Sequence, residues 1–544
     1  MRKSKFNLLL KYLQDNSIII ELLFAVSLFF IIAVNSYYFL GNKLSIIFIS
    51  YLIIYTFYRS LFGLFFNTLS LGLKINLYPA IAISSFLLTI VISKWPGLFQ
   101  NDSLGTLETV KSLNISNWYG LMSPILFIGQ YYVFPHEFSL VVPNLVVFAL
   151  STYICCIYIQ KSIKSWKISF IIISFLFVVF TMSVPLINHL LLAGHYTSLF
   201  GFLSLLIGVS IFTLLGSNEE FNYKPWLYVS VLSALSMGLR YEGVLNVLIT
   251  TLAIVLYIKK NFELSSKTNN VFKICFVLSP SLISVILIFL VNFVPYFDQK
   301  KNNHYEVLPL AGIAAYILKQ PDWISPDKKK TLESIGRFID IKYITETQHG
   351  HTEPNYFFHK RNLQATNEDK RSFISGVFEL ILWNPAHFMN SRLLLAFATS
   401  GMHQDGGWFY YDGIRLMNDP RIKELRDNYL RRPLPTLEAW LDQQMVSAAQ
   451  YKGVSTTGSF ISHNWVLFLI LFIIPIVFIK RNNIEFVFLV MVLIAKIPVN
   501  LIFMPTSHSM HYLTIYAGWT IVLCLAVSHS LRGYHGSARM RTKA

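Results

Sequence analysis

Long apolar runs dominate the chain, and short polar stretches separate them. Many of the runs are 17 to 25 residues long, which is the length that an α-helix needs to cross the hydrocarbon core of a bilayer. The pattern predicts helices over residues 18–40, 44–66, 76–94, 138–160, 168–187, 197–216, 226–239, 243–258, 273–295, 464–480, 485–504 and 511–531. We therefore expect an all-α polytopic membrane protein with about twelve transmembrane helices.

The basic residues indicate how these helices are oriented. With the predicted helices, short loops and helix ends on one side carry twenty Lys and Arg residues, and those on the other side carry four: Lys43, Lys94, Lys111 and Arg240. Cytoplasmic loops are enriched in Lys and Arg, so the first side is assigned to the cytoplasm. Both termini then lie in the cytoplasm, and residues 1–5 are interpreted as an end without a cleaved signal peptide.

Two longer polar segments fall on the extracytoplasmic side. One is the loop 95–137, which interrupts the nine helices expected in residues 1–295. The other is the insertion 296–463, which precedes the last three helices and the basic tail in residues 464–544. With twenty basic and eighteen acidic residues, the insertion has the composition of a folded soluble domain. We expect it to be mostly helical, with a helix over 372–398 that breaks at Asn384-Pro385 and lies on the membrane.

Composition excludes several classes of protein. The chain is 54% hydrophobic and 13% charged, whereas soluble domains carry about 25% charged residues. The net charge of +17 does not indicate nucleic-acid binding, because the basic residues follow the positive-inside pattern. The four cysteines lie in apolar runs without metal-ligand spacing, so a disulfide framework is not expected. Walker, Rossmann and GxSxG motifs are absent from the sequence.

Asp102 is the first candidate catalytic residue. It follows the predicted helix 76–94 in the segment Lys94-Trp95-Pro96-Gly97-Leu98-Phe99-Gln100-Asn101-Asp102-Ser103, and a carboxylate at a membrane boundary can act as a general base. It can equally cap the next helix. Glu108 can share a substrate site with Asp102 if the segment turns, or it can pair with Lys111 on one helix face.

Arg240 and Glu242 are the second candidate pair. They lie in Leu239-Arg240-Tyr241-Glu242-Gly243, between two apolar runs at a predicted extracytoplasmic helix end. Charged residues in so apolar a neighbourhood are paired or functional. Arg240 can bind a lipid phosphate with its planar donors, or Arg240 and Glu242 can simply close a helical hairpin.

Further candidates for substrate binding come from segments rich in histidine and aromatic residues. His403 and Asp405 belong to a Gly- and aromatic-rich stretch that suits sugar recognition or a surface turn, and His511 and Tyr512 precede the last helix. His349-Gly350-His351 lacks a strict metal-binding spacing. We therefore assign no metal ligand, and the cofactor, including a divalent cation, stays unidentified.

These features together resemble the GT-C superfamily of integral-membrane glycosyltransferases. The resemblance rests on about a dozen helices, an acid (Asp102) in an early extracytoplasmic loop, an arginine (Arg240) at a later external helix end, and a soluble insertion before the last helices. The segment Trp95 to Ser103 is similar to the Pro-Gly…Asp-Ser opening of bacterial members that modify surface polysaccharides. The chain differs in that the acidic loop follows the third helix, and no second acid lies near Gly194-His195-Tyr196.

The resemblance implies a bacterial inner-membrane enzyme that moves a sugar from a polyprenyl-phosphate donor to a glycan or lipid-linked acceptor. Asp102 would be the general base, and Arg240, helped by Lys94, would bind the leaving phosphate. The insertion 296–463 would hold the acceptor.

Two alternatives remain open from the sequence. A polysaccharide polymerase or ligase would rely on Arg and His residues of the large external segment. A transporter or flippase would depend on Lys496, the one ionisable residue that lies deep in a predicted span.

Overall fold

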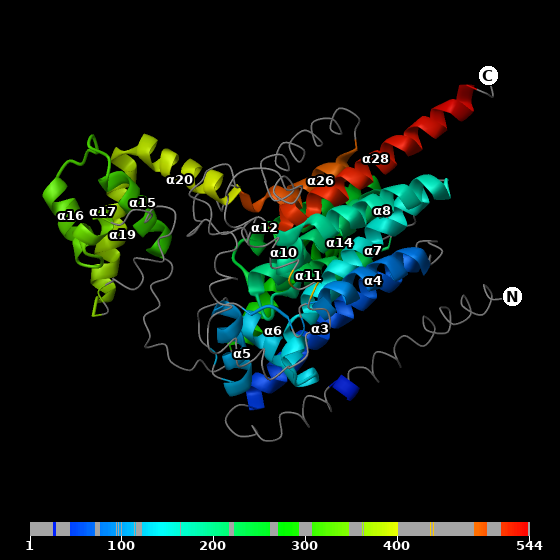
Figure 1. Cartoon of the computed structure of the whole chain (residues 1–544), viewed down its shortest axis with the longest axis horizontal. Coiled ribbons are helices and arrows are strands. Elements are labelled where there is room, and N and C mark those ends of the chain that lie inside the picture. The colour runs from blue at the N-terminus through cyan, green and yellow to red at the C-terminus, as the bar shows by residue number, and fades with distance from the viewer. Residues whose placement is uncertain are drawn as a thin grey trace. The chain divides into compact units, whose positions relative to one another are not determined.

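A computed structural model describes residues 26–28, 44–70, 77–93, 95, 97–99, 101–113, 115, 122–163, 165–216, 222–261, 270–292, 307–346, 362, 364–400, 436, 439, 483–497 and 513–541. The regular elements formed by these residues are helices, and no β-strand occurs among them (Figure 1). Six of the helices are long and apolar enough to cross a membrane: Ser45–Asn67, Val142–Ser162, Tyr196–Gly216, Gly243–Lys260, Val271–Leu290 and Leu513–Leu531. A helical membrane protein is therefore confirmed, whereas a total of twelve spans stays a prediction.

The helices follow most of the apolar runs that the described residues include. They are α3 (Leu44–Ser70), α4 (Leu77–Ser93), α7 (Val142–Ser162), α8 (Trp166–Met182), α10 (Tyr196–Gly216), α11 (Lys224–Leu239), α12 (Gly243–Lys260), α14 (Asn270–Asn292), α26 (Ile484–Ile494) and α28 (Leu513–Arg541). The predicted helices over 18–40, apart from residues 26–28, and over 464–480 lie outside the described residues. One of the twenty basic residues assigned to cytoplasmic loops and helix ends is Arg59, and it instead lies in the middle of α3.

The single helix predicted over 168–187 is wrong. α8 ends at Met182, Ser183 leaves the helical conformation with φ −87° and ψ 87°, and a short helix α9 (Val184–Leu191) follows. The physical reason is Pro185 in the first turn of α9, since proline has no N–H to donate to the carbonyl four residues before it, and a continuous helix would lose that hydrogen bond, whereas the start of a new helix does not need it.

The loop 95–137 contains regular structure that the sequence pattern did not predict. Helix α5 (Asn101–Ser112) and helix α6 (Met122–Val133) lie within it, and the 3-10 helix η2 (Glu137–Leu140) follows. The candidate residues Asp102 and Glu108 therefore both belong to helix α5 and not to an irregular loop.

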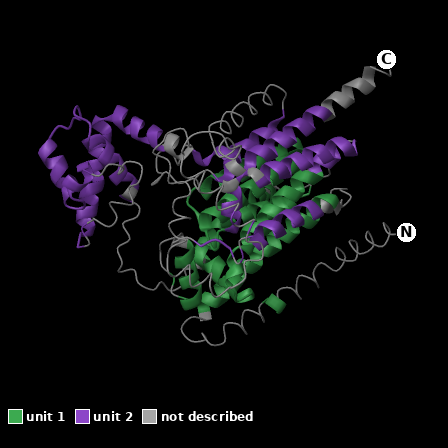
Figure 2. Cartoon of the chain, in the orientation of Figure 1, with its two compact units in different colours: residues 1–80, 101–157, 192–297 green, residues 81–100, 158–191, 298–544 purple. Residues whose placement is uncertain are grey.

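The chain divides into two compact units, which Figure 2 shows in different colours. Unit 1 comprises residues 1–80, 101–157 and 192–297, and unit 2 comprises the rest. In unit 1, the apolar window of α10 is 89% buried, whereas that of α14 is 28% buried. The exposed side chains of α14 are apolar and recur every three or four residues, at Val271, Ile274, Leu278, Leu282, Val285 and Phe289. Helix α10 is therefore central, and α14 presents one face to lipid.

Small polar side chains connect the helices inside unit 1. Ser230 of α11 lies 3.1 Å from the hydroxyl of Ser279 of α14, and Ser233 lies 2.7 Å from that of Thr250 of α12. The Asn246 side chain of α12 donates to the hydroxyls of Ser204 of α10 and Ser236 of α11, over 2.9 and 3.0 Å. Small residues let helix backbones approach closely, and hydrogen bonds between helices replace the water that an apolar interior lacks. Helix α11 is rich in serine, and through these side chains it is hydrogen-bonded to both α12 and α14.

The two ends of this helix cluster carry different groups. At one end, Lys260 donates to the carbonyl of Leu215 over 2.7 Å, and the N–H of Asn222 donates to the hydroxyl of Tyr257 over 2.8 Å. At the other end lie the start of α10, the end of α11 and the start of α12. Successive helices therefore run in opposite directions, as consecutive membrane spans do. Arg240 and Glu242 lie at the end of the unit where α11 ends and α12 begins.

Unit 2 combines apolar helices with a small helical domain. The ring of Phe86 in α4 packs on Phe177 and Phe180 of α8, with centroids 6.1 and 6.3 Å apart. The small helical domain consists of α15 (Leu308–Leu318), α16 (Lys328–Gly336), α17 (Ile341–Glu346), α19 (Asn367–Trp383) and α20 (Pro385–Ser400). It has a hydrophobic core of its own, built around the buried side chains of Ile335, Phe338 and Phe373.

The break predicted at Asn384-Pro385 is confirmed, because Asn384 ends α19 and Pro385 begins α20. The start of α19 is fixed by a capping box, in which the Thr366 hydroxyl accepts from the N–H of Asp369 and the Asp369 carboxylate accepts from the N–H of Thr366. Local signals in the sequence therefore determine both ends of this helix.

The turn between α11 and α12 depends on a glycine, which gives a first prediction. A Cβ at Gly243 would meet the backbone of Ser236 and Met237, which cannot move aside as a side chain can. We expect Gly243→Ala to lower the free energy of unfolding by about 1–3 kcal/mol, the usual effect of overpacking. Thermal unfolding in detergent, followed by reaction of the buried thiols of Cys155, Cys156 and Cys524, measures it.

The matched control is Gly336→Ala at the end of α16. A Cβ there would meet the side chain of Ile341 at 3.5 Å, an ordinary van der Waals distance. Equal unfolding temperatures for the two variants would contradict the assignment of Gly243 to a close backbone contact.

Candidate functional site

The turn from α11 to α12 holds the most strongly paired charges of unit 1 among the described residues. Arg240 follows the last residue of α11 in an extended conformation, with φ −148° and ψ 144°, and its N–H donates to the carbonyl of Ser236. Glu242 precedes α12, and the N–H of Gly243 donates back to the carbonyl of Arg240 over 2.9 Å. The tight turn brings the side chains of Arg240 and Glu242 to the same side.

These two side chains form a bidentate ion pair. The Nε of Arg240 donates to Oε2 of Glu242 over 2.9 Å, and Nη2 donates to Oε1 over 2.6 Å. The side chains of Arg240 and Glu242 are only 9% and 1% exposed. Burial by itself would lower the pKa of the Arg240 guanidinium, but the Glu242 carboxylate outweighs it and holds this pKa above its ordinary value. The guanidinium therefore keeps its charge at every physiological pH.

Arg240 also connects the turn to helix α10. Its Nη1 donates to the hydroxyl of Thr197 in the first turn of α10 over 2.7 Å. The guanidinium carbon lies 5.7 Å from the ring centroid of Tyr196 and 6.0 Å from that of Tyr241, within the range of cation–π attraction. One side chain thus joins the ends of three helices.

The segment that leads into α10 is held against α5 and η2. Gly194 has φ +60°, a conformation that favours glycine. Its N–H donates to the carbonyl of Leu140 over 2.9 Å, and its carbonyl accepts from the hydroxyl of Thr106 over 3.1 Å. A Cβ at Gly194 would lie 2.7 Å from the methyl carbon of Thr106, so α5 approaches this segment as closely as glycine permits.

Asp102 lies on the helix that makes this contact. It is the second residue of α5, and Thr106 lies four residues, about 6 Å along the axis, further on. The structure therefore places the backbone of Asp102 one helical turn from the contact with Gly194, and Thr197 follows Gly194 by three residues. The Asp102 side chain is outside what the structure describes.

Glu108 does not take part in the ion pair that was considered for it. Its side chain is exposed on α5, and the amine of Lys111 instead pairs with the Glu137 carboxylate of η2 over 2.7 Å. Glu137 is buried. An ion pair with a buried carboxylate is less screened by water than one with an exposed carboxylate such as Glu108, so it is stronger. This pair fastens η2 to α5.

The buried imidazole of His195 lies beside the same segment. Its Nδ1 is 2.9 Å from the hydroxyl of Ser198, and the N–H of Ser198 approaches the same atom at 3.3 Å. His195 therefore caps the start of α10. The sequence pattern did not single out His195, Thr106 or Thr197 as site residues. The sequence signal was Gly194 three residues before a Thr-Ser pair at a helix start.

The remaining candidates cannot be placed in this arrangement. Lys94, His403, Asp405, His511 and Tyr512 lie outside the described residues. Within the described part of the chain, no group of three or more His, Cys, Asp or Glu side chains lies close enough to hold a metal ion.

The ion pair gives a second prediction. Glu242→Ala leaves the buried Arg240 charge without its carboxylate, so we expect the free energy of unfolding to fall by about 3–5 kcal/mol. Denaturant unfolding in detergent checks it.

Glu108→Ala serves as the control, because it removes a carboxylate of the same unit that is exposed on α5. We expect it to lower the free energy of unfolding by about 1 kcal/mol or less. If Glu242→Ala is as stable as Glu108→Ala, the Arg240–Glu242 pair does not hold the three helix ends together.

No family model matches this chain, and no curated protein or solved structure matches it either.

Proposed function

We propose that the chain is an integral-membrane glycosyltransferase. It transfers a sugar from a polyprenyl-phosphate donor to a glycan or lipid-linked acceptor, on the extracytoplasmic face of a bacterial inner membrane. The observation that carries the proposal is the series of contacts from α5 through Gly194 and Thr197 to Arg240, which gathers an acid-bearing helix and a permanent cation at one end of unit 1.

A transfer of this kind needs a base and a cation at one membrane boundary. The acceptor hydroxyl gives its proton to the Asp102 carboxylate while its oxygen forms a bond to the anomeric carbon of the sugar. The bond from that carbon to the phosphate oxygen breaks, and the polyprenyl phosphate leaves with the electron pair. Negative charge grows on the phosphate in the transition state, where a fixed cation stabilises it most.

Arg240 can supply this cation without leaving Glu242. The guanidinium has five N–H groups, and its hydrogen bonds to Glu242 and Thr197 use three of them. The Tyr241 side chain also interacts with the guanidinium, and a remaining N–H group can donate to a phosphate oxygen. Glu242 therefore has a positioning role, because it fixes the plane of the guanidinium.

The rest of the proposal assigns the remaining candidates by their place in the chain. Lys94, directly before the segment that leads to α5, would assist at the donor phosphate. His403, Asp405, His511 and Tyr512 would contribute to binding the sugar or the acceptor, with the insertion 296–463 holding the acceptor.

A second candidate function rests on a different observation. Lys496 and His189 are both buried ionisable residues of unit 2. Buried ionisable groups in an apolar helical protein are typical of transport pathways, so this pair favours a transporter or flippase of lipid-linked sugars.

The third prediction separates these functions. We expect Asp102→Asn, which keeps the shape of the side chain but cannot accept the proton, to abolish sugar transfer. Mass spectrometry of the surface glycans, in cells that contain equal amounts of each protein, would show the loss of one sugar-sized mass. Glu485→Gln in the first turn of α26 is the control, since the proposal gives this carboxylate no role.

The other outcomes identify the alternatives. Glycans that keep their composition but become short in Asp102→Asn would favour a polymerase or ligase. Unchanged glycans in Asp102→Asn, together with their loss in Lys496→Met, would overturn the proposal in favour of transport.

A further inference from the structure

The small helical domain has one face whose exposed side chains are apolar. This α19–α20 face consists of Ile324, Phe378, Leu382, Trp383, Met389 and Leu393. Leu382 is 77% exposed, and each of the others is at least 38% exposed. Monomeric soluble domains rarely expose large apolar side chains so close together, and such patches mark interaction surfaces.

The periodicity of the two helices fixes this exposure. In α19, Phe378 and Leu382 lie one turn apart, while Phe373, Val377 and Leu380 are buried in the core of the domain. In α20, Met389 and Leu393 lie one turn apart, while Ser391, Arg392 and Leu395 are buried. Each helix therefore has a buried inner face and several apolar side chains on its outer face, where Arg371 and Ser375 of α19 and Asn390 of α20 are also exposed.

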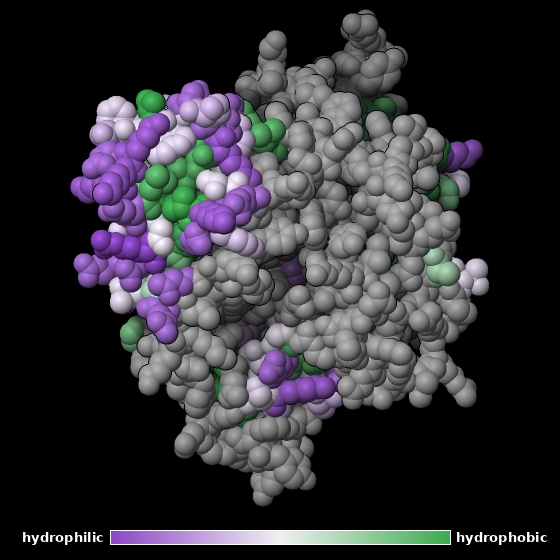
Figure 3. Space-filling view, turned by 60° about the vertical axis from the view of Figure 1, so that its left-hand side comes forward, coloured by the Kyte–Doolittle hydropathy of each residue, from purple (hydrophilic) through white to green (hydrophobic). Residues whose placement is uncertain are grey.

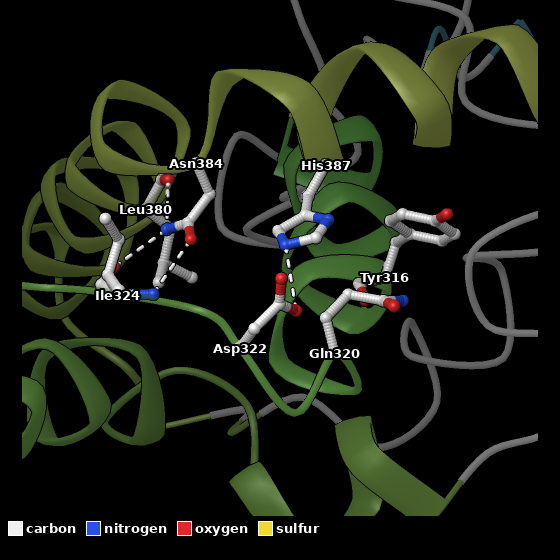
Figure 4. Close-up of polar contacts among 7 residues, drawn as sticks. All are labelled: Tyr316, Gln320, Asp322, Ile324, Leu380, Asn384 and His387. Carbon is white, nitrogen blue, oxygen red and sulfur yellow. Dashed lines mark hydrogen bonds and ion pairs between the residues drawn. The ribbon is translucent and has the colours of Figure 1, made fainter.

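The connection at Asn384 joins the two outer faces into one. The Asn384 side chain accepts from the N–H of Ile324 over 2.9 Å and donates to the carbonyls of Ile324 and Leu380 over 2.8 and 2.9 Å (Figure 4). One turn later, Nε2 of His387 lies 3.2 Å from Oδ1 of Asp322. These contacts tie the 322–324 loop to the corner between α19 and α20, so that Ile324 extends the same face.

Other outer faces of this domain have the composition of an ordinary solvated surface. The exposed positions of α16 and α17 include Lys328, Lys329, Lys330, Glu333, Lys342 and Glu346. In Figure 3, described apolar residues gather into a patch that polar residues surround. The contrast within one small domain indicates that the α19–α20 face is adapted to a particular environment.

We infer that the α19–α20 face lies on the surface of the membrane that the same chain crosses. Fifteen residues, 293–307, connect the end of α14 to α15, and they span about 50 Å at most. The domain is therefore kept within reach of the bilayer by the apolar helix α14. Trp383 at the corner of the face has the ring type that favours the interface between lipid and water.

Apolar contact, rather than charge, holds the face to lipid. The described part of the domain, residues 307–346 and 364–400, carries nine basic and eight acidic residues, so it has little attraction to anionic headgroups. An amphipathic surface of this kind lies in the headgroup region with its apolar side chains directed toward the acyl chains. The inference does not depend on the proposed glycosyl transfer.

The experiment uses the full chain in nanodiscs of zwitterionic lipid. The four native cysteines are replaced, a single cysteine is introduced as Leu382→Cys or Met389→Cys, and a fluorescent label is attached. Lys329→Cys on α16 is the matched control, because this position is exposed in the same domain. We expect brominated lipid to quench the label at 382 and 389 several-fold more than at 329, iodide to do the reverse, and salt to change neither result.

Two results would overturn the inference. Iodide quenching at 382 equal to that at 329 would mean that the face is in water. Protection from both quenchers would mean that protein covers it, either another segment of this chain or a second copy. If the cysteine replacements unfold the protein, a photo-reactive amino acid at position 382 of the otherwise unchanged chain distinguishes the same cases, since it cross-links to lipid, to protein or to neither.

Discussion

The buried ion pair between Arg240 and Glu242 is the interaction on which the arrangement of unit 1 depends. Removing two charges from water is unfavourable, and only a geometry in which each donor meets an acceptor compensates for it. The bidentate contact, with Thr197 as third partner, meets this requirement and fixes the end of α11, the start of α12 and the start of α10 relative to one another. The rest of the proposed site is assembled on this junction.

Buried uncharged polar groups in the interior of unit 1 are also paired with hydrogen-bonding partners. Serine, threonine and asparagine side chains of α10, α11, α12 and α14 pair across helix interfaces, as the contacts of Asn246 and Ser233 show. Such contacts suit an environment without water, where van der Waals packing and hydrogen bonds hold helices together. A rigid scaffold of this kind can hold a carboxylate and a guanidinium at fixed positions, which is what electrostatic catalysis requires.

The small helical domain differs from unit 1 in which of its apolar side chains are buried. Its core is formed by five short helices with an ordinary polar surface over α16 and α17, but its α19–α20 face remains apolar. A domain tethered to a membrane helix can leave such a face uncovered by its own chain, because the bilayer is always nearby. If the face rests on lipid, the domain is held at the surface where a polyprenyl-linked substrate would also be found.

The sequence by itself determined the features that depend on local pattern. The apolar runs gave the positions of most membrane helices, and the Asn384-Pro385 pair gave the break between α19 and α20, since length, hydrophobicity and proline act within a few residues. The sequence also indicated that Arg240 and Glu242 belong together, two positions apart between apolar helices.

Only the tertiary structure decided which distant residues meet. An apolar run does not reveal whether its helix is central like α10 or faces lipid like α14, because both environments favour the same side chains. Lys111 was expected to find Glu108 three residues away, yet it binds Glu137, and Thr106 meets Gly194 across 88 residues of sequence. These pairings follow from how helices pack and which groups they bury, and neither is encoded in a local pattern.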